Sequence, residues 1–212
     1  MNQNMFTLLT KIMPDNKILA IYKVGSSIFG LSDDESDKDY IVIVDGFDGT
    51  NVIKEDNCDF FVIGDSYFEK LCKFDDRVMS YFAIWMDNVL LASENLQYID
   101  EGYRERFNAL ININWKTCFK KWLGRIIDYF RIRLDDIGNS KPLYHLFRIR
   151  ALVEHYIKTS KFEYYFPEKD RELALKFKKN PRNYLKELNE VFSYLEEVYK
   201  EAYCCLYRQV LF

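Results

Sequence analysis

The most constraining feature of this 212-residue chain is an apolar segment that ends in a glycine-serine turn and is followed by two closely spaced acids. Residues 18–24 form the apolar segment, Gly25 and Ser26 form the turn, and Asp37 and Asp39 are the acids. Side chains two residues apart on a strand point to the same face, so both carboxylates project to one side. This order predicts a strand, then a tight turn, and then a second strand that begins at the pair of carboxylates.

A third acid, Asp59, opens another apolar run at residues 60–63. If this run pairs beside the strand that follows Asp39, three carboxylates come together and raise one another's pKa unless a cation compensates. Mg²⁺ prefers oxygen ligands and keeps coordination positions for phosphate oxygens and water. Two such ions, roughly 3.5–4 Å apart, clamp both oxygens of an in-line displacement. The acids therefore predict a site for Mg²⁺ or Mn²⁺.

The glycine-serine turn suits the phosphate end of such a site. Gly25 lets the backbone approach a phosphate closely, because it has no side chain. Ser26 and Ser27 offer hydroxyl and N–H groups, and a short helix that begins there points its positive end at a triphosphate. We expect Gly30 to end that helix.

Taken together, these residues resemble the signature of the nucleotidyltransferase superfamily that has the polymerase-beta-like fold. The resemblance rests on Gly25-Ser26-Ser27-Ile28-Phe29-Gly30 and on Ser36-Asp37-Lys38-Asp39-Tyr40. It extends to uncharacterised bacterial and phage members that have a helical C-terminal half. The resemblance implies that Asp37 and Asp39 bind metal, that Asp59 is the third carboxylate, and that Gly25 and Ser26 contact a nucleoside triphosphate. The acidic cluster Asp33-Asp34-Glu35 is a departure that offers alternative carboxylates.

The predicted fold class is α+β, with a small mixed-sheet nucleotidyltransferase domain at residues 1–108 and a helical bundle domain at residues 109–212. We expect Asp65 and Ser66 to cap a helix of about 15 residues, after which the chain is mostly helical. The other predicted elements are a helix at 5–13, strands near 18–24, 38–45 and 58–63, a short strand at 52–54, and helices at 115–133, 143–156 and 185–206.

Two residues of the helical half are candidates for the site. His145 and Arg148 share one face of the predicted helix at 143–156. By analogy with similar nucleotidyltransferases, in which a basic helix faces the cleft, they would contact the phosphates or the acceptor. The alternative for each is structural: a surface salt bridge or a buried histidine with its hydrogen bonds satisfied.

The last predicted helix has an apolar stripe with alternating spacings of three and four residues, Leu185, Leu188, Phe192, Leu195, Tyr199, Ala202 and Leu206. A heptad-like stripe can form a homodimer seam, or it can close the bundle of its own chain.

The composition bears on the expected location and partners of the protein. The five cysteines include no Cys-x-x-Cys pair, so a zinc site or disulfide framework is not indicated and the reducing cytoplasm is the expected location. No apolar run reaches membrane-spanning length, and we expect no membrane partner. The net charge of −3 lacks the basic excess of a dedicated nucleic-acid binder.

The predicted function is transfer of a nucleoside monophosphate from ATP or another nucleoside triphosphate to an acceptor hydroxyl, with release of pyrophosphate. The acceptor stays open between RNA or tRNA, a protein side chain and a small molecule. Two alternatives remain. One is a catalytically silent nucleotide-binding or antitoxin-like interaction module of the same fold. The other is a metal-dependent phosphoesterase that uses the same carboxylates.

Overall fold

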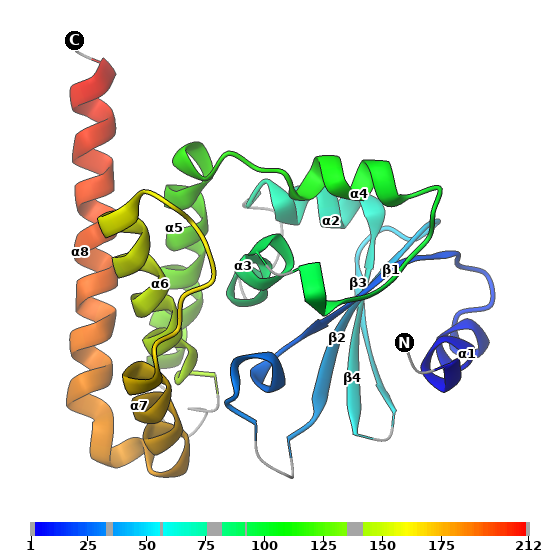
Figure 1. Ribbon diagram of the computed structural model, residues 1–212, viewed down its shortest axis with the longest axis horizontal. Helices are drawn as coiled ribbons and strands as arrows, with labels where there is room; N and C mark the ends of the chain where they lie inside the picture. Colours follow the sequence, from blue (N-terminus) through cyan, green and yellow to red (C-terminus); the bar gives the residue numbers. More distant parts are fainter. Residues whose placement is uncertain are drawn as a thin grey trace. The chain divides into compact units, whose positions relative to one another are not determined.

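A computed structural model of the chain describes residues 3–32, 36–55, 57–75, 82–91, 93–134 and 142–210. It divides the chain into two compact units (Figure 1). The first comprises Met1–Val78 and Trp85–Ile113, and the second comprises Met79–Ile84 and Asn114–Phe212. The domain boundary at residues 108 and 109 stays a prediction.

The first unit contains a five-stranded mixed sheet with the order β3-β4-β2-β1-β5. Strands β2 and β4 pair in parallel, and the other neighbours pair antiparallel. The prediction of an α+β chain, with a small mixed sheet and a helical part, is confirmed. The strands are β1 (Ile18–Val24), β2 (Lys38–Val44), β3 (Thr50–Glu55), β4 (Cys58–Gly64) and β5 (Leu96–Ile99).

Helices cover both faces of this sheet, because its central strands are apolar on both sides. On one face α1 (Gln3–Ile12) buries Leu9 against a cluster that includes Val42 and Val44. The opposite face carries α2 (Asp65–Cys72), which contacts β2 and β4, and α4 (Arg104–Ile111). Trp85 of α3 (Ala83–Leu91) packs on Phe61 of β4 on this face, with 4.5 Å between the ring centroids. There Phe107 of α4 stacks on Tyr22 of β1 at 6.3 Å and on Phe68 of α2 at 5.7 Å.

Two predictions for this unit are wrong in detail. The helix after β4 has 8 residues, and Gly64, not Asp65, is its N-cap. It ends early because Phe74, with φ at 50°, adopts the left-handed conformation that terminates helices. The strand β5 falls where we expected helix. With only 4 residues, all half-buried, it is too short to have a readable period.

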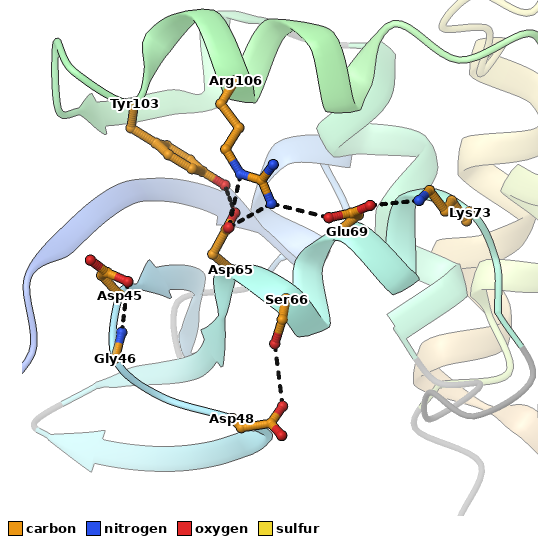
Figure 2. Close-up of polar contacts among 9 residues, drawn as sticks. All are labelled: Asp45, Gly46, Asp48, Asp65, Ser66, Glu69, Lys73, Tyr103 and Arg106. Atoms are coloured by element: carbon orange, nitrogen blue, oxygen red, sulfur yellow. Dashed lines mark hydrogen bonds and ion pairs between the residues drawn. The ribbon is translucent and has the colours of Figure 1, made fainter.

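Asp65 joins the helices of this unit instead of capping one (Figure 2). Its Oδ1 accepts a 2.5 Å hydrogen bond from the Tyr103 hydroxyl, and its Oδ2 accepts one of 2.8 Å from Arg106. Arg106 also donates to Glu69 at 3.0 Å, and Lys73 donates to the same carboxylate. The network ties α2 to the segment that starts α4, and these helices lie over the face of the sheet that carries Asp39.

We predict that Tyr103→Phe lowers the free energy of unfolding by about 1–2 kcal/mol, because it removes a hydrogen bond to a carboxylate from a buried side chain. Urea denaturation of both proteins measures the difference. Arg104→Ala is the control, since its ion pair with Glu101 is exposed and lies within a single turn. Equal loss in both variants would contradict a special role for the Tyr103 contact.

The second unit is helical, as predicted. Its elements are α5 (Trp115–Leu134), α6 (His145–Thr159), α7 (Glu168–Lys179) and α8 (Leu185–Val210). The predicted helices at 115–133, 143–156 and 185–206 are confirmed. We did not predict α7, which buries only Ala174 and Phe177 and therefore has a weak apolar pattern.

The stripe on α8 packs within its own chain where its side chains are described. Leu188, Phe192 and Leu195 are buried, and α8 contacts α5 and α6. A homodimer through this helix stays a prediction. Among the helices that the structure describes, none has both the length and the apolar composition needed to cross a lipid bilayer.

Candidate functional site

The parallel pairing of β2 and β4 brings two of the predicted acids together. Asp39 and Asp59 are register partners on these strands. Side chains in register on neighbouring strands point to the same face, and the strands are about 4.8 Å apart. The pair lies near the first residue of each strand, Lys38 of β2 and Cys58 of β4, so two carboxylates project from adjacent strands at one end of the sheet.

Asp37 lies one residue before β2 and two before Asp39. A hydrogen bond of 2.8 Å from the Lys38 amide to the Asn57 carbonyl continues the β2–β4 pairing to this point. Alternation along the chain places Asp37 on the side of Asp39. The alternative carboxylates Asp33, Asp34 and Glu35 lie outside the described residues.

Gly25 makes room for the Asp39 carboxylate. With φ at 82° and ψ at −171°, Gly25 adopts a backbone conformation that is open essentially only to glycine. A Cβ at this position would lie 1.9 Å from Oδ2 of Asp39. The acid therefore packs directly on the glycine backbone, so the turn and the acid pair form one site.

The serines of the turn form a short 3-10 helix, η1 (Ser26–Phe29). Gly30 ends it in the left-handed conformation, as predicted, and its N–H donates to the Ser26 carbonyl. Ser26 is buried. The Ser27 hydroxyl is also buried, and it has no hydrogen-bond partner among the described residues. Its hydrogen-bonding capacity is therefore unused beside Gly25.

The structure adds Lys54, which we did not predict. Lys54 of β3 is the register partner of Asp59, and its Nζ lies 2.7 Å from Asp59 Oδ2. The hydrogen bond to Asp59 raises the pKa of Lys54, and the negative charges of Asp59, Asp37 and Asp39 add to this effect. The signal was present in the sequence, because two β-rich runs separated by a short polar turn predict a hairpin that places residues 54 and 59 opposite one another.

The donor set fits a divalent ion that is held by few protein ligands. Mg²⁺ typically uses one or two carboxylates and keeps water and phosphate in its other positions. Asp39, set against Gly25, and Asp37 are oxygen donors of this kind. Among the described residues, however, no three Asp, Glu, His or Cys side chains are placed to hold an ion together. Metal binding therefore stays a prediction.

His145 and Arg148 lie in the core of the second unit, where their side chains are only 3% and 2% exposed. Arg148 donates a 2.7 Å hydrogen bond to the carbonyl of Ile84, and His145 packs against the Tyr144 ring. Both side chains are therefore buried, and neither forms the surface salt bridge that we considered as an alternative. A contact of His145 or Arg148 with a phosphate or an acceptor stays a prediction.

Burial of His145 predicts sensitivity to acid. Burial, and then the positive charges of Arg148 and Lys178, hold the pKa of His145 well below its ordinary value. Below pH of about 6.5 the unfolded chain takes up a proton that the folded chain does not, so stability is present above this pH and is lost as pH falls, by up to about 1.4 kcal/mol per pH unit. Urea midpoints at pH 7.5 and 5.5 measure the loss.

In a His145→Gln variant this component of the acid sensitivity disappears. The matched control is His155→Gln, which replaces the other histidine of the chain and leaves the buried ring in place. The control should retain the loss of stability between pH 7.5 and 5.5. An unchanged pH dependence in His145→Gln would contradict the assignment.

Comparisons with known proteins add little to this geometry. No protein-family model matches the chain, and no curated protein matches it. Among solved structures, it matches a nucleotidyltransferase-like protein from Exiguobacterium sibiricum 255-15, with 14% sequence identity over 94% of this chain and 74% of that chain. The TM-score of this match is 0.34, which is too low to support an argument about function.

Proposed function

We propose that this chain is a divalent-metal-dependent nucleotidyltransferase that transfers a nucleoside monophosphate from a nucleoside triphosphate to an acceptor hydroxyl. The observation that carries the proposal is the Asp39 carboxylate, which lies against Gly25 and in register with Asp59. Acids on two adjacent strands beside a bare glycine backbone suit a triphosphate that is bound through its metal ion. Asp37, two residues before Asp39, adds a further oxygen donor.

In this proposal the oxygen of the acceptor hydroxyl forms a bond to the α-phosphorus. The bond between the α-phosphorus and the oxygen that bridges to the β-phosphate breaks, and pyrophosphate leaves. Asp59 accepts the hydroxyl proton. Asp37 and Asp39 hold Mg²⁺ or Mn²⁺, which when bound neutralises charge on the phosphates.

The backbone at Gly25 and the hydroxyls of Ser26 and Ser27 position the triphosphate. Since the reaction demands little covalent chemistry from the protein, positioning and charge neutralisation are its main contributions.

A silent nucleotide-binding module is the second candidate. The observation that favours it is the ion pair of Lys54 with Asp59, because a neutralised third carboxylate suits binding without turnover. The acceptor class stays open between RNA or tRNA, a protein side chain and a small molecule, and the expected location stays the cytoplasm.

Release of pyrophosphate separates these candidates. The protein is incubated with ATP, CTP, GTP or UTP, with Mg²⁺ or Mn²⁺, and with a cell lysate that supplies acceptors. Pyrophosphate above the lysate background supports transfer, while nucleotide binding without pyrophosphate supports the silent module. Product release that consumes no triphosphate would support a phosphoesterase instead.

A further inference from the structure

The acidic site contains a cation of its own. Lys54, Asp59 and Asp39 form one row across the three adjacent strands β3, β4 and β2, because Lys54 pairs with Asp59 and Asp59 pairs with Asp39. Residues in register share a face of the sheet, so the ammonium and the carboxylates project to the same side. The row ends at Gly25, where the Asp39 carboxylate meets the backbone.

We propose that Lys54 supplies, at Asp59, the positive charge that a second divalent ion would otherwise supply, so that the site binds one Mg²⁺ or Mn²⁺ per chain. The inference rests on the proposed function and names the metal requirement of that site. The single ion lies with Asp37 and Asp39, and Lys54 remains on Asp59.

The balance of charge supports this arrangement. Asp37, Asp39 and Asp59 carry like charges near the start of β2 and β4, and like charges repel one another unless a cation offsets them. Lys54 compensates one of them through a direct contact of 2.7 Å. One divalent ion held by Asp37 and Asp39 would bring two positive charges to these two carboxylates. The phosphate oxygens of the triphosphate can then bind the same ion and the hydroxyls of Ser26 and Ser27.

The position of Lys54 on the sheet also supports a site with a single divalent ion. An isolated exposed ion pair contributes little, and the Lys54 side chain is 71% exposed. Lys54 is not isolated, however, because its strand position is opposite Asp59 and it lies in the field of Asp37 and Asp39. Within the described part of the chain, no group of three Asp, Glu, His or Cys side chains is placed to hold a metal ion. Asp59 is directed to Lys54 instead.

The test counts bound Mn²⁺ by electron paramagnetic resonance, with the α,β-methylene analogue of each of the four nucleoside triphosphates in turn. Mn²⁺ bound to the nucleotide alone is measured separately and subtracted. We expect one Mn²⁺ per chain in the unmodified protein and two in Lys54→Met. Lys54→Arg keeps the charge and should restore one.

Lys38→Met is the matched control. Lys38 lies beside Asp37 and Asp39, but strand alternation directs it to the opposite face, so its loss should leave one Mn²⁺ per chain. Thermal denaturation confirms that each variant is folded. Two Mn²⁺ in the unmodified protein, or one in folded Lys54→Met, would overturn the role of Lys54 and leave the proposed function standing. Absence of both Mn²⁺ and nucleotide binding in the unmodified protein would overturn the proposed function itself.

Discussion

Replacing Asp39 with asparagine is expected to lower nucleotidyl transfer on the order of a thousandfold, the scale on which loss of one preorganised electrostatic group acts. Asparagine keeps the shape of the side chain against Gly25 but removes the charge beside Asp59. The fold should persist, and its stability in metal-free buffer should stay equal or rise, because one of the crowded negative charges is gone. Initial rates of pyrophosphate release and urea midpoints measure the two effects.

Asp48→Asn is the control for this experiment. Asp48 is an acid of the same unit, and its contact is a hydrogen bond of 3.2 Å from the Ser66 hydroxyl, shown in Figure 2. Since Asp48 lies outside the acid row, its replacement should leave transfer within about twofold, as for a surface change away from such features. Full activity in Asp39→Asn would contradict the proposed site, and so would full activity after replacement of both Asp37 and Asp39 by alanine.

Gly25→Ala is expected to damage the same site through the backbone. An alanine at this φ carries a strain of about 1–3 kcal/mol. Its Cβ would also lie 1.9 Å from Asp39 Oδ2, so the carboxylate or the turn must move. We expect a loss of stability together with a loss of transfer on the order of a hundredfold or more, because a displacement of about 1 Å is enough to cost that much.

Gly49→Ala is the control that separates the effect of backbone strain from the effect of a collision between the new Cβ and a neighbouring side chain. Gly49 also has a positive φ, 123°, but a Cβ there would meet no atom within 4 Å. Gly49→Ala should therefore lose stability and keep its transfer activity per folded molecule. If Gly25→Ala kept its activity in the same way, the close approach of Gly25 to Asp39 would have no role in function.

The sequence predicts the local part of this site well, because local rules are strong there. Glycine before a short helix and alternation along a strand place Gly25, Asp37 and Asp39 without any knowledge of the sheet. Asp59 lies near Asp39 only if the strands that carry them are neighbours in the sheet. The sequence does not determine whether they are neighbours. The structure shows that they are neighbours, because β2 and β4 pair in parallel.

The burial of His145 and Arg148 depends on tertiary contacts that no local pattern encodes. His145 and Arg148 have the same helical spacing whether their face meets solvent or other helices, and only the packing of the second unit shows that they are buried. Lys54 was missed because we treated residues 52–54 as a minor strand. The hairpin pattern of residues 50–63 could have placed it opposite Asp59, as the register of β3 and β4 shows.

The measurement that tests the central claim most directly follows two labels of one nucleotide. The protein, Mg²⁺ and an acceptor-containing lysate are incubated with a nucleoside triphosphate labelled at the α-phosphate or at the γ-phosphate, with Asp39→Asn in parallel. We expect the α-label to enter an acceptor, the γ-label to leave in pyrophosphate, and both events to depend on Asp39. Transfer of the γ-label to an acceptor, or no Asp39-dependent movement of either label while the protein is folded, would contradict it.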